Sequence, residues 1–301
     1  MLDTVIIGAG ISGMTAAIYA SRKRMDFVII TSKVGGQFME SGEVLNYPGI
    51  VETTGAKFAS KMEEQLKFNN VEIKVETAVK IEKVGDNFKV VTDKGEYETK
   101  TVIMATGARP RELEVPGEKK YKNKGITYCA ICDGPLFSGK DVAVIGAGDA
   151  ALEAVDFLLK IAKKIYVLNI GEKMAAHEYL QERIKGQKNV EVVNNAKTTE
   201  VLGDGKMVSG LKYSQKGAEK EIKVGGVFVE IGRVPNTDFA KNLVKIDEHG
   251  HILIDCTTHA SVPGIFAAGD CASGHEYQYV IAAGQGCMAL IKAARYLASK
   301  K

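Results

Sequence analysis

Tryptophan is absent from the 301 residues of the sequence, and both proline (6) and cysteine (5) are scarce. An odd and small number of cysteines in a chain of this length excludes the disulfide framework of a small secreted protein. The hydrophobic share of 45% and the 32 glycines exclude the collagen-like and intrinsically disordered classes. The length predicts about two domains, each long enough to bury a core.

An excess of charge of one sign is also missing. The 40 Lys and Arg residues against 37 Asp and Glu residues give a net charge of +3, which is too small to indicate a nucleic-acid-binding or membrane-binding surface. No run approaches the roughly 18 to 20 apolar residues of a membrane span. The first residues lack the basic and then apolar pattern of a signal peptide, so we expect a cytoplasmic protein with no nucleic-acid or membrane partner.

The first motif present is a glycine-rich turn between a strand and a helix. An apolar run at 4–7 leads into Gly8-Ala-Gly10-Ile-Ser-Gly13, a helical pattern follows over 14–22, and a second apolar run occupies 27–30. This order is typical of a dinucleotide-binding unit. Gly8 permits the tight turn, Gly10 lets backbone N–H groups approach a pyrophosphate, and Gly13 allows close helix packing. The N-terminus of the helix favours the negative charge.

The same unit recurs about one domain later. A strand pattern at 141–145 precedes Gly146-Ala-Gly148-Asp-Ala-Ala151, and helix and strand patterns follow at 152–162 and 165–168. A single glycine turn is often purely structural, but two in the same context favour an α/β protein with two Rossmann-like domains. Near the C-terminus an apolar strand ending at Gly269-Asp270 precedes an amphipathic helix. We expect this segment to rejoin the first domain, so that the second domain is an insertion.

Two of the five cysteines, Cys129 and Cys132, have the C-x-x-C spacing of a redox pair. Half of a zinc site would look the same, but the sequence has no second Cys or His pair at ligand spacing, so we expect no metal. Asp133 follows the pair directly, as a general acid or base for the thiols or as the cap of the next helix. We expect Cys256, Cys271 and Cys287 to be structural.

Together these motifs resemble the low-molecular-weight thioredoxin reductases over nearly the whole chain. The resemblance implies an FAD domain of residues 1–112 and 243–301, an inserted nicotinamide-domain-like domain of residues 113–242 that carries the cysteine pair, and a homodimer. The matching stretches are Gly8 to Gly13, Gly35-Gly36-Gln37, Asn46-Tyr-Pro-Gly49, Ala105-Thr-Gly-Ala108, Cys129-Ala-Ile-Cys132-Asp133, Gly146 to Ala151, Gly269-Asp270 and Gly286-Cys287-Met288-Ala289.

The resemblance also implies roles for single residues. Gln37 and Asn46 would lie near the isoalloxazine or the ribityl chain of FAD, and Asp270 near the ribityl or phosphate region. Cys132 would face the flavin, while Cys129 would exchange with the disulfide of the partner, thioredoxin. The other residues implied to bind FAD are Gly8, Gly10, Ser12, Gly13, Gly36, Thr106, Gly107 and Gly269. The acid that the generic fingerprint places after the second strand is replaced by Thr31-Ser32-Lys33, a departure that the family shares.

The chain departs from the NADPH-dependent members where a 2′-phosphate would bind. Those members have a His-Arg-Arg run and a further Arg, because a phosphate dianion needs charge-assisted, bidentate bonds. Residues 168–175 here read Leu-Asn-Ile-Gly-Glu-Lys-Met-Ala. An NADH site would need a carboxylate at the strand end, where Asn169 stands, and Glu172 is an uncertain substitute.

A second departure precedes the last helix. Where many members have Arg-Gln, this chain reads Glu276-Tyr-Gln-Tyr279, so that Tyr279 either stacks on the flavin or packs on the core.

Both departures resemble the ferredoxin-dependent flavin thioredoxin reductases. The resemblance therefore implies an enzyme that passes electrons from reduced ferredoxin through FAD and the cysteine pair to thioredoxin. Three alternatives stay open: an NADH- or NADPH-dependent thioredoxin or peroxiredoxin reductase, an FAD-dependent dithiol oxidase, and a redox-responsive FAD-binding protein without turnover.

Overall fold

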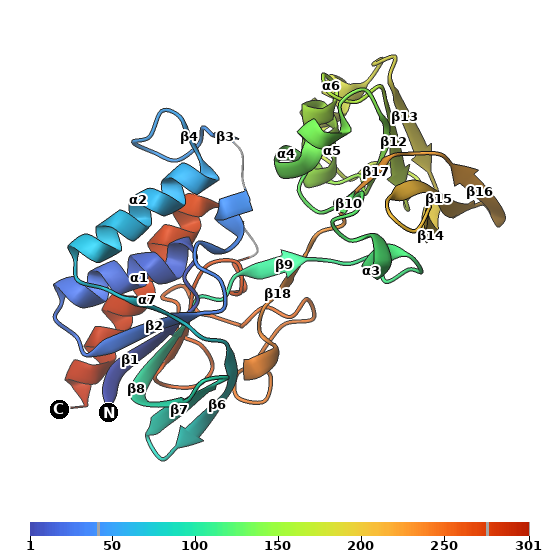
Figure 1. Ribbon diagram of the computed structural model, residues 1–301. Coiled ribbons are helices and arrows are strands. Elements are labelled where there is room, and N and C mark those ends of the chain that lie inside the picture. The colour runs from blue at the N-terminus through green and yellow to red at the C-terminus, as the bar shows by residue number, and fades with distance from the viewer. Residues whose placement is uncertain (41–42, 275–276, 301) are drawn as a thin grey trace. The chain divides into compact units, whose positions relative to one another are not determined.

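The chain is divided into two compact units in the computed structural model, which describes residues 1–40, 43–274 and 277–300 (Figure 1). Unit 1 consists of Met1–Arg109 and Val234–Lys301, and unit 2 of Pro110–Arg233. The sequence placed the second boundary at 243. Residues before that point belong to unit 1 because Ala240, together with Val244, is buried in its core.

The sheet of unit 1 combines strands from both of its chain segments. β1 (Leu2–Ile7) pairs in parallel with β2 (Phe27–Thr31) and β8 (Glu96–Met104), and β2 pairs with β5 (Ile73–Val75). β6 (Ala78–Val84) and β7 (Asn87–Thr92) form an antiparallel hairpin beside β8. β19 (Ile265–Ala267) pairs in parallel with β8, which confirms that the C-terminal segment returns to the first domain.

α1 (Ile11–Arg22) and α7 (Tyr279–Ser299) pack against this sheet, and α2 (Gly55–Phe68) packs on α1 (Figure 1). The buried face of α1 is made largely of small residues, which allows α7 to approach closely. At the crossing, a Cβ on Gly286 would lie 2.1 Å from the Ser12 carbonyl oxygen. α2 begins at Thr54, whose hydroxyl accepts the Lys57 amide at 3.3 Å. The shorter elements of unit 1 are η1 (Gly36–Glu40), β3 (Glu43–Val44), β4 (Thr53–Thr54) and η3 (Asp238–Ala240).

Unit 2 contains a five-stranded parallel sheet in the order β10 (Ile126–Thr127), β17 (Gly226–Val229), β11 (Asp141–Ile145), β12 (Lys164–Asn169) and β13 (Val190–Asn194). The chain order reverses between β11 and β17, which is the switch point where α/β sheets bind ligands. The remaining elements are α3 (Glu118–Tyr121), α4 (Ala130–Asp133), η2 (Gly134–Phe137), α5 (Asp149–Leu158), α6 (Glu178–Ile184), β14 (Ala196–Gly203), β15 (Val208–Gln215) and β16 (Ala218–Ile222).

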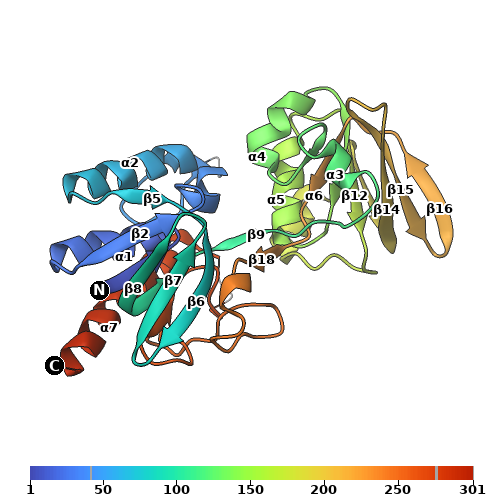
Figure 2. The same cartoon turned by 60° about the horizontal axis from the view of Figure 1, so that its bottom comes forward.

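Alternate residues of β11 build two cores on opposite faces of the sheet of unit 2. Val142 and Val144 pack with the helices, whereas Ala143 and Ile145 pack with the antiparallel sheet β14–β15–β16. Figure 2 shows α5 and the three-stranded sheet on opposite sides of the parallel strands. The parallel strands are therefore buried on both faces, as in other doubly wound folds.

The two chain connections between the units run through β9 (Ala108–Pro110) and β18 (Arg233–Pro235), which pair with each other. No helix among the residues described combines the length and the apolar character required to cross a membrane.

Candidate functional site

In the glycine turn after β1, two glycines are required by close backbone contacts, and the third faces open space. A Cβ on Gly8, where φ is +107°, would lie 2.2 Å from the Ala105 carbonyl oxygen, and a Cβ on Gly13 would lie 1.8 Å from the Gly8 carbonyl oxygen. Both distances are far below van der Waals contact. Gly10 has no atom within 4 Å of its Cβ position, so the chain there faces open space.

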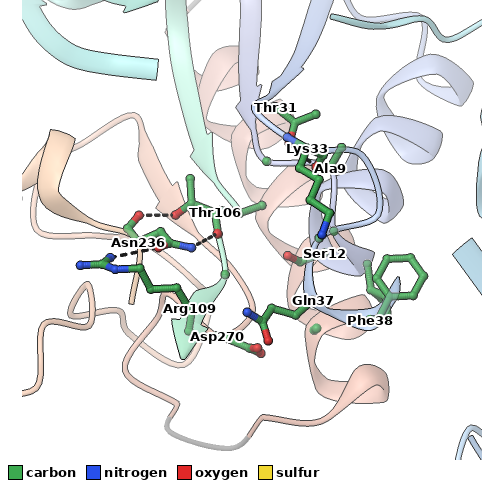
Figure 3. A pocket seen from close by; sticks show the side chains of 18 of the residues that line it. Ala9, Ser12, Thr31, Lys33, Gln37, Phe38, Thr106, Arg109, Asn236 and Asp270 are labelled. Carbon is green, nitrogen blue, oxygen red and sulfur yellow. Dashed lines mark hydrogen bonds between the residues drawn. The ribbon is translucent and has the colours of Figure 1, made fainter. Parts of the chain in front are cut away.

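That space is a cleft in unit 1, lined by both of the unit's chain segments. Figure 3 shows Gln37 and Asp270 pointing into the same part of it. α1 starts at the cleft with no side-chain cap and no acidic residue in its first turn, so its N-terminal amides favour an anion. The predicted site residues that line the cleft are Gly8, Gly10, Ser12, Gly36, Gln37, Thr106, Gly107, Asp270 and Tyr279.

Three predicted residues do not line the cleft. Gly13 lies behind the turn, where it packs on Gly8. Gly269 supports Ser12, since a Cβ on Gly269 would lie 2.8 Å from the Ser12 Oγ, and its amide donates to Gln285 Oε1 at 2.7 Å. Asn46 is exposed and donates to Gln278 Oε1 at 3.4 Å. The structure therefore brings nine of the twelve predicted FAD residues to the cleft wall and leaves these three outside it.

Tyr279 packs on the core and also borders the cleft, so its stacking on the flavin stays a prediction. It lines the cleft as the first residue of α7. Its ring also meets Phe38 edge-on, at 6.1 Å between centroids, and lies 6.4 Å from the Phe58 ring. The aromatic cluster fixes the ring beside the cleft. Glu276, which belongs to the same sequence departure, lies outside the described residues.

Asn236 is one of the cleft residues that the sequence analysis missed. Its side chain donates to the Thr106 carbonyl at 3.0 Å and accepts from Arg109 Nη1 at 3.1 Å, while Thr106 Oγ1 donates to the Asn236 carbonyl at 2.7 Å (Figure 3). These bonds join the turn after β8 to the second segment of unit 1. The only local signal was the Pro235-Asn236 dipeptide, which indicates a turn and not a binding residue.

The cysteine pair lies in unit 2. Cys129 and Cys132 form a disulfide with their Cα atoms 5.4 Å apart. The Cys132 amide donates to Cys129 Sγ at 3.2 Å, and Cys132 is exposed while Cys129 is half-buried. Asp133 does not cap the next helix; its carboxylate accepts the hydroxyl of Thr127. The carboxylate is thus held beside the pair, available for proton transfer.

A buried carboxylate fixes the chain that leads into the pair. Glu118 is 1% exposed and accepts the amides of Leu113 and Glu114, each at 2.7 Å. It also accepts the Tyr128 hydroxyl at 2.8 Å. Burial and this carboxylate raise the pKa of Tyr128, so the hydroxyl remains a donor. Tyr128, the residue before Cys129, is therefore anchored to the start of unit 2.

The second glycine turn repeats the backbone geometry of the first. Gly146 has φ +122°, and its Cβ would lie 2.1 Å from the Glu230 carbonyl oxygen, whereas the Cβ position of Gly148 has no atom within 4 Å. Asn169, the last residue of β12, is buried; it donates to Asn194 Oδ1 at 2.9 Å and accepts the Gly171 amide at 3.0 Å. The Asn169 side chain holds the loop that follows β12 in place. The strand therefore ends in an amide, where a dinucleotide site would have a carboxylate or a guanidinium.

No group of three or more His, Cys, Asp and Glu side chains within the described ranges is arranged to hold a metal ion. Of the other cysteines, Cys271 is buried, Cys256 is exposed and Cys287 is intermediate. Burial raises the pKa of the Cys271 thiol, which keeps it protonated and unreactive.

Residues 2–294 match the family model described as pyridine nucleotide-disulphide oxidoreductase. The chain belongs to this family. Thioredoxin reductase from Lactococcus lactis (FR conformation) has a TM-score of 0.91 and 34% identity over 99% of this chain and 100% of that one. The T. acidophilum thioredoxin reductase has a TM-score of 0.87 and 36% identity over 100% and 99% of the two chains. A ferredoxin-flavin thioredoxin reductase from Clostridium acetobutylicum has a TM-score of 0.56 and 32% identity over 99% and 98%.

Curated relatives from this oxidoreductase family are longer than the chain. A Bacillus subtilis protein named NADH dehydrogenase is 40% identical over 299 residues, and the match covers 98% of this chain and 58% of that protein. A Pseudomonas aeruginosa protein named as part of alkyl hydroperoxide reductase is 39% identical over 302 residues, with the same two coverages, 98% and 58%. The chain thus spans about 58% of the length of these relatives.

The thioredoxin reductases of this family are FAD-binding flavoproteins, and FAD is the cofactor of this chain. The cleft of unit 1 fits that group. Its wall is open at Gly10, where a Cβ would enter the cleft, and the uncapped N-terminus of α1 is suited to a pyrophosphate. The chain is therefore an FAD-binding member of the pyridine nucleotide-disulphide oxidoreductase family, and its fold is that of the thioredoxin reductases.

Proposed function

We propose that this flavoprotein passes electrons from reduced ferredoxin, through FAD and the Cys129–Cys132 disulfide, to thioredoxin. The observation that carries the choice of donor is the loop after β12. Asn169 is committed to Asn194 and Gly171, and Ile170 is 71% exposed. A 2′-phosphate or an adenine ribose would meet neither the basic cluster nor the carboxylate that it requires.

The proposal assigns the FAD domain to unit 1 and the nicotinamide-domain-like fold to unit 2, and it includes a homodimer. Bound FAD supplies electron transfer to a disulfide, accepting electrons singly or in pairs. The amides of the first glycine turn would hold its pyrophosphate, since Gly10 leaves the cleft wall open there. Gln37 and Asp270 would orient its polar groups, and Tyr279 would pack beside it.

In unit 2 each member of the redox site has its own part in the proposal. Two electrons and two protons would reduce the Cys129–Cys132 disulfide to a dithiol, with Cys132 as the sulfur that receives the electrons. The Cys129 thiolate would then attack the disulfide of thioredoxin, which forms a mixed disulfide and releases one thioredoxin thiolate. Cys132 would attack this mixed disulfide, so that the second thioredoxin thiolate leaves and the Cys129–Cys132 disulfide forms again. Asp133, held by the Thr127 hydroxyl, moves the proton between thiol and water.

An anaerobic donor experiment tests this function. The purified flavoprotein is mixed separately with reduced ferredoxin, NADH and NADPH, the flavin absorbance is followed, and oxidised thioredoxin is then added. Reduced ferredoxin is expected to bleach the flavin, and thioredoxin to restore its colour. Rapid bleaching by NADPH or NADH at micromolar concentration would reject ferredoxin as the donor.

A pyridine-nucleotide-dependent reductase of thioredoxin or of a peroxiredoxin is the second candidate. The names of the curated relatives favour it, since they include an NADH dehydrogenase and alkyl hydroperoxide reductase proteins. The same experiment separates the two candidates, because only this second one requires NADH or NADPH to reduce the flavin.

A further inference from the structure

Glu230 lies at the edge of the unit 2 sheet where the redox pair begins. β10 and β17 are parallel, with Thr127 the partner of Phe228 in the register. β10 ends at Thr127 and β17 at Val229, so Cys129 and Glu230 both lie just beyond the carboxyl ends of these neighbouring strands. On the other side of β17, Ile145 is the partner of Val229, so Gly146 also meets Glu230. The carboxyl ends of these strands thus gather the cysteine pair, this glutamate and the second glycine turn.

The Glu230 carboxylate lies beside the backbone N–H of Ala130, the first residue of α4, and this N–H favours its charged form. The Ala130 nitrogen is bonded to the carbonyl carbon of Cys129, which places the carboxylate within about 7 Å of Cys129 Sγ. Asp133 is occupied by the Thr127 hydroxyl. Glu230 is therefore a second acidic group at the pair, and the mechanism above gives it no part.

The charged groups that face Glu230 come from two other elements. Glu153 of α5 repels its negative charge and Arg233 of β18 attracts it. Burial is the largest influence and raises the pKa of Glu230 to about 7, against the opposing effects of Arg233 and the Ala130 amide. Glu153 itself faces Asp149, and burial raises the pKa of Glu153 as well.

We propose that Glu230 is a positioning residue of the redox pair: through the Ala130 amide it orients the Cys129–Cys132 turn, and its charge state sets how readily the reduced pair forms a thiolate. The role of the pair as the electron-transferring dithiol rests on the proposed function. When Glu230 is neutral, the pKa of the redox thiol is the lower of its two values, because no negative charge from Glu230 opposes the thiolate. When Glu230 is ionised, a second negative charge beside Cys129 raises the thiol pKa by about half to one unit.

The test measures the thiolate directly and needs no electron donor and no thioredoxin. The holoprotein is reduced with dithiothreitol, desalted anaerobically and alkylated with iodoacetamide between pH 5.5 and 9. The peptide that carries Cys129 and Cys132 is followed by mass spectrometry. Exposed Cys256 serves as an internal control, because its alkylation profile is expected to be the same in every variant.

In wild-type protein, the alkylation rate plotted against pH is expected to show an inflection near pH 7, in addition to the rise that accompanies ionisation of the thiol. In Glu230→Gln the amide still accepts the Ala130 N–H, so the turn is kept while the charge is lost. This variant is expected to show a single titration. It should react about three- to ten-fold faster than wild type at pH 8 and at the same rate at pH 5.5.

Glu153→Gln is the matched control, since it removes a neighbouring charge that has no bond to the redox turn. It is expected to keep the inflection and to move it to lower pH, because Glu153 raises the pKa of Glu230. A wild-type profile with the thiol titration alone would overturn the proposal, even if the variants failed to fold. Equal rates for Glu230→Gln and wild type at pH 8 would also overturn it. Failure of the donor experiment alone would leave this result standing.

Discussion

One buried carboxylate, Glu118, anchors the chain that leads into the redox pair of unit 2. Glu118 accepts three hydrogen bonds from residues on both sides of α3. Glu118→Ala would leave three part-buried donors without their acceptor, which costs about 3 kcal/mol. We therefore expect a clear drop in the denaturation midpoint of the holoprotein.

Glu112→Ala is the control for this prediction. The Glu112 carboxylate pairs with Lys122 at 2.7 Å, with side chains 36% and 46% exposed, and exposed pairs contribute less than about 1 kcal/mol. Equal midpoint losses in the two variants would contradict the anchoring role of Glu118.

The raised pKa of Glu230 predicts that the free energy of unfolding depends on pH. Its folded-state pKa of about 7 lies above the ordinary value of 4.5, so the native state binds the proton more tightly than the unfolded state. This contribution is complete below the ordinary pKa and is lost as the pH rises through about 7. Allowing for its partial exposure, wild type should lose about 2 kcal/mol relative to Glu230→Gln between pH 5 and pH 8. Melting temperatures that fall in parallel for both proteins would refute this.

At the scale of the element, the two glycine turns offer a matched pair of substitutions. Gly10 and Gly148 both have extended backbone (φ −82° and −88°) and no atom within 4 Å of the Cβ position. Alanine is therefore tolerated by the fold at either site. Gly10→Ala places a methyl group in the FAD cleft, so we expect a folded protein that loses FAD on dilution.

Gly148→Ala is the control, and it is expected to retain FAD and the same rate of flavin reduction by ferredoxin. Flavin fluorescence after ultrafiltration and stopped-flow bleaching provide the two measurements. A loss of flavin from Gly148→Ala that equals the loss from Gly10→Ala would show that the first turn has no special role.

The sequence predicted those features that local sterics determine, and it missed those made by distant partners. Gly8, Gly10 and Gly13 were interpretable because a strand, a turn and a helix constrain each glycine within a few residues. Asn236 was not, because its partner Thr106 precedes it by 130 positions. The role of Glu230 depends on strand order in the sheet of unit 2, which no local pattern encodes.

At the scale of the whole molecule, unit 2 is a continuous segment with its own cores. Residues 110–233 contain the parallel sheet, the three-stranded sheet and the cysteine pair. Near its ends the Arg111 amide donates to the Gly232 carbonyl at 2.9 Å, so the two termini of the excised segment would already be joined.

We expect residues 110–233, expressed alone, to unfold cooperatively and to form the Cys129–Cys132 disulfide, but to bind no FAD, because every cleft residue belongs to unit 1. Circular dichroism during heating and thiol titration before and after reduction would measure this. A non-cooperative melt would show that the segment depends on unit 1 to fold.

The open space at Gly148 has a consequence for engineering. The turn that would accommodate a pyrophosphate is intact, and what unit 2 lacks is a handful of side chains between Asn169 and Ala175. On the proposed function, arginines introduced along this short stretch are expected to create a binding site for the 2′-phosphate of NADPH while the strands and helices of unit 2 stay as they are. The choice of electron donor would then depend on a few loop side chains and not on the fold.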